Sequence, residues 1–296
     1  MTNLKNPDFA KHFDKAVFLG DFVNGSKEWH DLRNQPGVIS GSEIGAILGL
    51  SPFTSAYTLW AQKSGLIDSE VAGNIAMRLG QLVEPAILQL YREQHPEQQV
   101  FEVGTFAHKD FDWAHANPDA LGIDESGTPF ILEIKHTATY WDAVPEHYKA
   151  QVFWYMWVFD VKKAVFAVVN AGRYKEYEVL FDDFEFAAIL DRVTKFKRLV
   201  ETGEAPDWDG SESTFETVRS LSPEIEDTRE ELGQLGIELW NAQQKVKEAE
   251  THLTEMKSRT ISALNGAKYG VVEGTVVCVL SQRGQGKPFL TIKDNK

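Results

Sequence analysis

The stretch that decides the fold runs from residue 117 to residue 135 and reads Asn-Pro-Asp-Ala-Leu-Gly-Ile-Asp-Glu-Ser-Gly-Thr-Pro-Phe-Ile-Leu-Glu-Ile-Lys. Its last part alternates with period two, so residues 130, 132 and 134 face one side of a strand and residues 131, 133 and 135 face the other. Residues 121–124 predict a second strand, and residues 125–128 have turn-forming composition. We therefore expect an antiparallel hairpin that brings Asp119 close to Glu133.

The hairpin places three charged side chains, Asp119, Glu133 and Lys135, at one strand edge. Two carboxylates and a lysine suit a hard divalent cation such as Mg²⁺, together with an oxyanion to be stabilised or a water to be activated. The alternative interpretation is a surface hairpin with a cross-strand ion pair, which is a common feature. These residues alone leave both interpretations open.

The composition predicts a soluble globular protein. The chain has 296 residues, of which 43% are hydrophobic, enough for one large domain or a domain with an appendage. The net charge of -14 argues against a basic coat for nucleic acid, although it allows a local basic groove. The single cysteine, Cys278, excludes an internal disulfide and a thiolate metal cluster. Without a signal sequence or an apolar run of about 18 to 20 residues, we expect a cytoplasmic protein with no membrane partner.

Upstream of the hairpin, the sequence indicates a site for an anion. Residues 29–33 predict a helical turn, and residues 40–43 form a capping box that opens a helix from Ile44. The free N–H groups of that helix and the hydroxyls of Ser40 and Ser42 would hold a phosphate, with Arg33 close enough to add charge. The alternative is an ordinary helix cap.

The remaining segments predict a mixed α/β or α+β fold with a central sheet and helices packed on its faces. Glu84 stands at the beginning of an apolar-faced helix, where a first-turn acid is also favourable by itself. Residues 99–106 alternate as one strand. In the helix over residues 144–159, His147, Gln151 and Tyr155 share a face. Two strands over 161–171 and 177–181 and a helix over 184–200 follow.

Four segments are expected along the chain. They are an extension at 1–24, a core domain at 25–200, an acidic linker at 201–231, and an appendage at 232–296 with a long helix and a β-hairpin made of residues 269–281 and 289–294. The long helix carries an apolar seam with alternating spacings of three and four, which indicates a coiled coil or a docked helix. Its partner, either the core of the same chain or a neighbouring subunit, is left open. The seam consists of Leu232, Leu235, Leu239, Ala242, Val246, Ala249, Leu253 and Met256.

The ordered set of Glu84, Asp119, Glu133, Lys135 and Gln151 with Tyr155 resembles the PD-(D/E)XK nuclease superfamily. Within it, the sequence is most similar to the lambda exonuclease or YqaJ-type viral recombinase family. The resemblance covers roughly residues 28 to 175 and implies a restriction-endonuclease-like core. It also rests on Trp29-His30-x-Leu32-Arg33, on Val38-Ile39-Ser40-Gly41-Ser42-Glu43, on Gly80-x-x-x-Glu84 and on Ala150-Gln151-Val152.

The resemblance implies roles for these residues. Asp119 and Glu133 would bind two Mg²⁺ ions, with Mn²⁺ as an alternative metal, and the Ile134 carbonyl and Glu84 would complete the site. Lys135 would orient the attacking water or stabilise charge in the transition state, and Gln151 and Tyr155 would line the site. Arg33 and Ser42, with Ser40 beside them, match a pocket for a terminal 5′-phosphate.

Two departures from the family pattern affect this assignment. Asn-Pro-Asp-Ala replaces Ser-Pro-Asp-Gly, and the longer link to Glu133 leaves Asp124 as a rival to Asp119 for the first metal ligand. Residues 34–36 are an insertion between Arg33 and the serines of the expected phosphate pocket.

The expected function is a Mg²⁺-dependent exonuclease that digests double-stranded DNA from 5′ to 3′. It would leave 3′ single strands for an annealing protein in recombination. A ring-shaped homotrimer is compatible with the resemblance. The alternatives are a structure-specific or sequence-specific endonuclease with the same core, and a non-catalytic scaffold that binds DNA ends.

Overall fold

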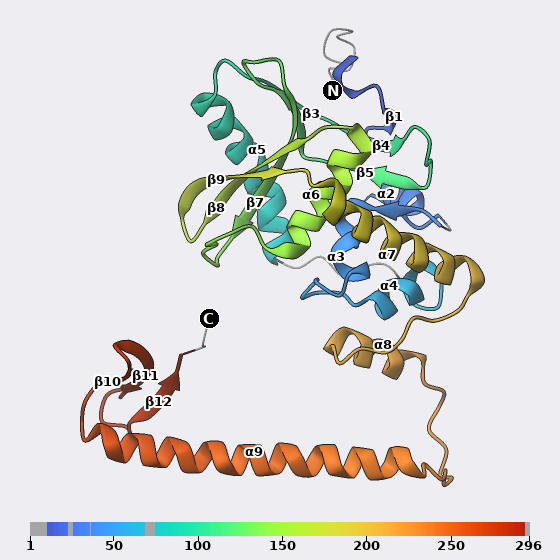
Figure 1. The fold of residues 1–296 in the computed structure, drawn as a ribbon. Coiled ribbons are helices and arrows are strands. Elements are labelled where there is room, and N and C mark those ends of the chain that lie inside the picture. Colours follow the sequence, from blue (N-terminus) through green and yellow to red (C-terminus); the bar gives the residue numbers. More distant parts are fainter. Residues whose placement is uncertain (1–10, 23–25, 36, 69–74, 294–296) are drawn as a thin grey trace. The chain divides into compact units, whose positions relative to one another are not determined.

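The computed structural model describes residues 11–22, 26–35, 37–68 and 75–293 (Figure 1). Two compact units are distinguished, Met1–Pro223 and Glu224–Lys296, and each is described by itself. The first unit combines two mixed sheets with flanking helices, which confirms the predicted α+β class. No helix in the described part of the chain combines the length and the apolar character needed to cross a bilayer.

The main sheet of the first unit has five strands in the order β3-β6-β7-β8-β9. Only β7 and β8 are parallel, and α6 (Glu146–Phe159) forms the connection between them. The predicted hairpin is confirmed, because β6 and β7 pair antiparallel with Ala120 opposite Leu132. The strands are β3 (Gln99–Glu102), β6 (Ala120–Ile123), β7 (Pro129–Thr137), β8 (Lys163–Asn170) and β9 (Arg173–Leu180).

Strand β7 is buried on both faces, and its alternation separates two apolar cores. Phe130, Leu132 and Ile134 pack with Ile87 and Tyr91 of α5 (Ile75–Gln94). Ile131 belongs to the larger core that includes α6 and α7 (Asp183–Thr202). Figure 1 shows α5 and α6 on either side of the main sheet. The predicted two-faced strand is confirmed, and Glu133 therefore projects toward the α6 side.

The second sheet has four strands in the order β1-β4-β5-β2. Our prediction of one strand over residues 99–106 is wrong, since the chain leaves the main sheet after β3 and enters this sheet as β4. Gly104 lies at the crossing, where an added Cβ would stand 2.3 Å from the Gly20 carbonyl oxygen. The strands are β1 (Ala16–Gly20), β2 (Ile39–Ser40), β4 (Thr105–His108) and β5 (Ala114–Ala116).

Serine side chains cap the short helices near the N-terminus. Ser26 caps α2 (Lys27–Arg33), and Ser55 caps α4 (Ala56–Lys63). The predicted capping box is confirmed: Glu43 accepts a hydrogen bond from the Ser40 N–H at 2.8 Å, around the single turn η3 (Gly41–Glu43) that leads into α3 (Ile44–Ile47). A further turn, η2, covers Lys11–Phe13.

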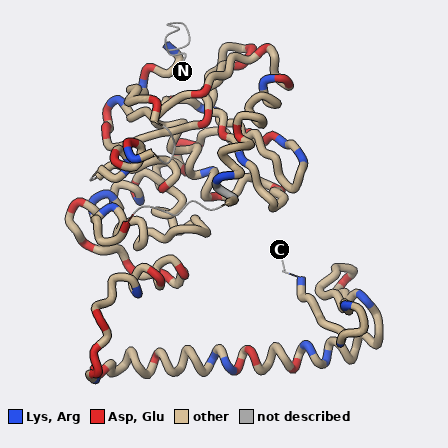
Figure 2. The backbone as a smooth tube through the Cα atoms, turned by 180° about the vertical axis from the view of Figure 1, so that it is seen from behind, with Lys and Arg blue, Asp and Glu red and all other residues tan. Residues whose placement is uncertain are grey.

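The segment for which we predicted an acidic linker begins with ordered structure. Helix α8 (Glu212–Leu221) lies in it and packs against α4 through hydroxyl groups. Thr217 lies 2.8 Å from the Thr58 hydroxyl, and Thr214 donates to Ser55 at 2.8 Å. A run of acidic residues follows Pro223 in the stretch before the long helix (Figure 2), and it consists of Glu224, Glu226, Asp227, Glu230 and Glu231.

The second unit consists of the predicted long helix and a small sheet. Helix α9 covers Gln234–Leu264 and has no buried residue. The sheet has three strands, β10 (Tyr269–Val272), β11 (Thr275–Ser281) and β12 (Phe289–Ile292), in that order. We predicted a single strand over 269–281, but Glu273 and Gly274 have φ values of 49° and 82° and form a tight turn that splits it.

Candidate active site

The hairpin brings Asp119 and Glu133 together, as the sequence predicts. Asp119 directly precedes β6, and its Oδ2 accepts a hydrogen bond from the Ile134 N–H at 2.6 Å. Glu133 lies opposite on β7 and is only 2% exposed. Both carboxylates thus stand at the point where the two strands separate. The Ile134 N–H of β7 holds the Asp119 carboxylate in place.

One oxygen of the Glu133 carboxylate accepts two hydrogen bonds, and the other is orphaned, without a hydrogen-bond donor among the described residues. Oε1 accepts hydrogen bonds from Lys135 Nζ at 2.6 Å and from Gln151 Nε2 at 2.8 Å. Oε2 is buried and has no hydrogen-bond partner among the described residues. A buried carboxylate oxygen without a partner is costly, so its presence indicates a ligand that supplies positive charge.

Gln151 and Tyr155 form the wall of the site that the sequence predicts. Both project from α6, one turn apart, and Gln151 Nε2 donates to the Tyr155 hydroxyl oxygen at 3.0 Å. The amide thus holds Tyr155 and Glu133 together. Lys149 is turned away, as predicted, and pairs with Glu185 at 2.8 Å.

Glu84 lies in the middle of α5, because that helix already begins at Ile75. The interpretation of Glu84 as a first-turn acid is therefore wrong. The favourable effect of a helix N-terminus on a carboxylate does not explain an acid in the middle of a helix. Burial and the Asp119 charge raise the pKa of Glu84 to about 7, which indicates that the two carboxylates interact. The next residue, Pro85, lacks an N–H and so removes one hydrogen bond from this helix.

We call Glu84, Asp119, Glu133 and Lys135 the carboxylate cluster. Its charges favour the binding of a cation. Burial and the Glu133 charge raise the pKa of Asp119 to about 7, and burial raises the pKa of Glu133 against the opposing effect of Lys135. Burial lowers the pKa of Lys135, but the charges of Glu133 and Asp119 outweigh this effect and raise it overall. Three carboxylates and one ammonium would carry a net charge of about -2 when ionised, which a divalent cation would neutralise.

The cluster is not a complete cage for a metal. In the described part of the chain, no three His, Cys, Asp or Glu side chains are gathered closely enough to hold an ion by themselves. This arrangement still suits Mg²⁺, which keeps several waters and is commonly bound through one or two carboxylates together with phosphate oxygens of the substrate. The orphaned oxygen of Glu133, with Asp119 beside it, fits such an open site.

Asp124 lies at the other end of the hairpin, in the turn. Its Oδ1 accepts hydrogen bonds from the N–H groups of Ser126 and Thr128, and its Oδ2 pairs with Lys163 at 2.6 Å. Burial acts to raise the pKa of Asp124, but these hydrogen bonds and the Lys163 charge lower it strongly. Asp124 therefore stabilises the turn, and Asp119 is the carboxylate that reaches Glu133.

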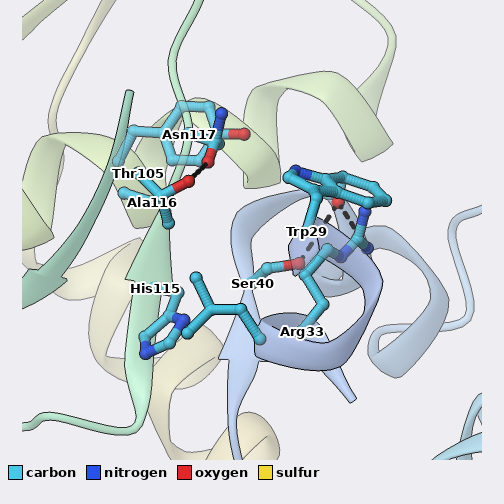
Figure 3. Close-up of a pocket in the computed structure, with 10 residues that line it drawn as sticks. Trp29, Arg33, Ser40, Thr105, His115, Ala116 and Asn117 are labelled. Atoms are coloured by element: carbon cyan, nitrogen blue, oxygen red, sulfur yellow. Dashed lines mark hydrogen bonds between the residues drawn. The ribbon is translucent and has the colours of Figure 1, made fainter. Parts of the chain in front are cut away.

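The residues predicted to bind phosphate line one pocket. Figure 3 shows Trp29, Arg33 and Ser40 facing Thr105, Ala116 and Asn117 across it. Arg33 stacks 4.2 Å from the Trp29 ring centroid and donates to the Ser42 hydroxyl at 3.0 Å. The insertion at residues 34–36 does not move Arg33 away from the serines. The lining is completed by Leu32, Ser42, His115 and Tyr155.

Sequence reasoning missed two residues that hold Arg33 in place, Glu43 and Lys63. The buried Glu43 Oε1 lies 3.3 Å from Arg33 Nη2 and 2.9 Å from Lys63 Nζ. Lys63 also donates to the Arg33 carbonyl oxygen at 2.9 Å. The capping-box pattern that predicts the place of Glu43 does not signal a buried ion pair with a distant segment. Two cations share one carboxylate, so one positive charge is left beside the pocket.

Two glycines join the pocket to the carboxylate cluster. A Cβ on Gly41 would stand 2.2 Å from Tyr155 Cε1, and one on Gly45 would stand 2.9 Å from the His147 Cβ. Because both positions lack a side chain, the Ser40–Ser42 turn and α3 can lie directly on α6. Tyr155 therefore lines the phosphate pocket while bonding, through Gln151, to Glu133.

His147 is the third member of the α6 face that we predicted, although we assigned it no role. Its Nε2 is buried without a hydrogen-bond partner among the described residues. Burial and the nearby Lys135 charge lower its pKa. A neutral imidazole therefore stands at the edge of the site.

The model of the YqaJ-like viral recombinase domain family matches residues 28–162, the segment that holds both the pocket and the carboxylates. This segment belongs to the YqaJ-like family. The resemblance stated from the motifs is thereby confirmed. Among relatives of the YqaJ-like domain is the uncharacterized protein YqaJ of Bacillus subtilis (strain 168). It is 25% identical in an alignment of 259 positions that covers 81% of this chain and 79% of that protein.

Solved structures share the fold of the YqaJ-like domain. The alkaline exonuclease LHK-Exo from Laribacter hongkongensis superimposes with a TM-score of 0.50 and 20% identity, covering 67% of this chain and all of that one. Its complex with dAMP also gives a TM-score of 0.50, with 21% identity over 60% of this chain and 94% of that one. At these identities the likeness concerns the fold.

Proposed function

We propose that this protein is a Mg²⁺-dependent exonuclease that digests double-stranded DNA from 5′ to 3′ and leaves 3′ single strands for an annealing protein. The observation that carries the proposal is the hydrogen-bonded connection from the pocket to the carboxylates. Tyr155 lines the pocket, Gln151 bonds to Tyr155, and Glu133 accepts from Gln151. A site for a phosphate and a site for a cation are thus built from adjoining side chains.

The pocket supports recognition of a chain end. A terminal phosphate carries more negative charge than an internal phosphodiester, and the surplus positive charge of the Arg33, Lys63 and Glu43 group favours it. Ser40 and Ser42 add hydroxyl groups that can donate to phosphate oxygens. A 5′-phosphate held there would place the first phosphodiester of that strand toward Tyr155 and Glu133.

The carboxylate cluster supports hydrolysis of that phosphodiester. Asp119 and Glu133 would hold the cation, with Glu84 and the Ile134 carbonyl as further oxygen ligands or as partners of its waters. A cation held by these residues would stabilise the negative charge that develops on the phosphodiester oxygens. Mn²⁺ prefers the same oxygen ligands.

The remaining residues of the cluster act on the water and on the developing charge. Lys135 is held 2.6 Å from Glu133 and keeps its proton, because its pKa is raised. It would stabilise the charge that develops on the phosphoryl oxygens and orient the attacking water. Gln151 would fix Glu133, and Tyr155 would separate the terminal phosphate from the reacting one.

Digestion of linear duplexes tests the proposal. The substrates carry a label at either end, with or without a 5′-phosphate, and are followed over time with Mg²⁺ and with EDTA. We expect cation-dependent shortening of each strand from its 5′ end, faster on phosphorylated ends. A duplex that stays unchanged with Mg²⁺ would refute a nuclease and favour an end-binding scaffold. Full activity of Glu133→Gln would refute the proposed role of Glu133 in the site. Cleavage of closed circular duplex would favour the endonuclease.

A further inference from the structure

Helix α9 carries an apolar seam that is exposed along most of its length. The residues at the first position (a) of the heptad are Leu239, Val246 and Leu253, and those at the fourth position (d) are Leu235, Ala242, Ala249 and Met256. Leu232, which the sequence places in the same seam, precedes the helix, because α9 begins at Gln234. Within the second unit, the small sheet contacts only the C-terminal end of the helix, where Leu264 lies near Gly270. The large seam residues from Leu232 to Leu253 are between 43% and 64% exposed.

The period and width of this seam indicate which surface can cover it. A helix that lies on a globular core shows a stripe about 100° wide, because apolar residues also occupy the flanking e or g positions. In α9 those flanking positions carry Gly236, Gln243, Glu250 and Lys257 on one side and Glu238, Lys245, His252 and Arg259 on the other. A strict seven-residue repeat also drifts by about 20° per heptad around a straight helix. Only another helix that supercoils with α9 can follow it.

We propose that α9 is a dimerisation helix whose partner is α9 of a second copy of this chain, in a parallel, in-register coiled coil. Among the described helices, α9 is the longest at 31 residues, and the 20-residue helices α5 and α7 already bury their apolar faces in the core unit. A second copy supplies a helix of matching length and heptad phase.

The flanking charges fit the parallel orientation. In a parallel pair, each g residue faces the e residue five positions later on the other helix. Lys245 therefore meets Glu250 of the second copy twice by symmetry, while Glu238 meets the neutral Gln243. His252 meets Lys257, so one of these three kinds of pair joins opposite charges and none joins two carboxylates. Acidic and basic residues are interspersed along α9 (Figure 2).

Cross-linking of a seam position tests the orientation. In a parallel pair Leu239 faces its own counterpart, whereas in an antiparallel pair it faces Met256, about 25 Å away along the axis. We expect the full-length Leu239→Cys variant to form a disulfide-linked dimer, with residue 239 in the linked peptide. Gln244→Cys, at the outward f position, and the wild-type chain with only Cys278 are the controls. A folded Leu239→Cys chain that does not cross-link above these controls overturns the proposal.

The mass in solution tests the interface independently. Sedimentation of the 33.4 kDa chain at micromolar concentration should give a multiple of this mass. The double variant Leu239→Glu with Val246→Glu should lower it, and Gln244→Glu should not. A monomeric wild type, or an unchanged mass for the double variant, overturns the proposal. DNA digestion reports on the core unit and fails or succeeds separately from these measurements.

Discussion

The buried pair of Glu43 and Lys63 offers a sharp test of how the phosphate pocket is built. The Lys63 side chain is 2% exposed and the Glu43 side chain 8%, so neither charge can be compensated by water. In Glu43→Gln the ammonium of Lys63 would lose its carboxylate while remaining buried. Breaking a buried pair in this way costs about 3–5 kcal/mol. For a domain of about 200 residues, this corresponds to a fall in Tm of roughly 6–20 °C.

Thermal and urea denaturation of matched variants measures this cost. The exposed pair Lys27–Asp31, with side chains 81% and 63% exposed, provides the control, and Asp31→Asn should cost less than about 1 kcal/mol. Removing both buried charges, in Glu43→Gln with Lys63→Met, should restore much of the lost stability, because no unpaired charge remains in the interior. Lys63→Met alone should cost less than Glu43→Gln, since Glu43 keeps Arg33 and the Ser40 N–H.

The same variants report on function, because Glu43 also holds Arg33. Glu43→Gln should raise KM for 5′-phosphorylated ends more than for unphosphorylated ends, with a smaller change in kcat. The reasoning is refuted if Glu43→Gln destabilises the protein by less than about 1 kcal/mol. It is also refuted if the double variant is no more stable than Glu43→Gln, because an unpaired lysine would then not be the cause.

Three further predictions follow from the site. Asp119→Asn should abolish cation-dependent cleavage, a loss of several kcal/mol in transition-state stabilisation. Asp124→Asn should cost about 1–3 kcal/mol of folding stability, while the folded fraction keeps its activity. The reverse pattern in digestion assays would assign the metal to Asp124. Because the pKa values of Glu84 and Asp119 are raised to about 7, their protons must leave before a cation binds. Cation affinity measured by calorimetry should therefore weaken as the pH falls from 8 to 6, and equal affinities would contradict the proposed ligands. Their raised pKa values also mean that the metal-free protein loses stability as the pH rises from the unfolded values toward 7, so Mg²⁺ should raise Tm more at pH 8 than at pH 6. Gly41→Ala should cost about 1–3 kcal/mol by overpacking against Tyr155 and weaken the preference for 5′-phosphate, and an unchanged crystal position of Tyr155 would refute this account.

Local chemistry fixed the features that the sequence predicted well. The hairpin was readable because alternation and turn composition act over a few residues, and its register then placed Asp119 beside Glu133. The shared face of Gln151 and Tyr155 was readable because helical spacing is regular. These predictions needed only the geometry of one strand pair and one helix.

The sequence was uninformative where a residue depends on distant segments. The place of Glu84 within α5 was missed because Pro85 favours a helix start, and the helix continues through it. The polar face of α8 binds α4 through hydroxyl groups, so an acidic, serine-rich segment that reads as a linker contains a docked helix. The Glu43–Lys63 pair joins residues 20 positions apart, and only the packing of α4 beside the pocket brings them together.

The charges of the two halves of the site explain how a chain with a net charge of -14 can act on DNA. The pocket has one surplus positive charge from Arg33 and Lys63 against Glu43. The carboxylate cluster has a surplus of negative charge that would repel a phosphodiester. A divalent cation at Asp119 and Glu133 would neutralise the second half, which would then no longer repel phosphates. The connection through Tyr155 and Gln151 holds the two halves in register. Under the proposed function, a chain end would therefore be bound productively only when the phosphate and the cation are both present, and end recognition would be linked to hydrolysis without a basic surface over the rest of the molecule.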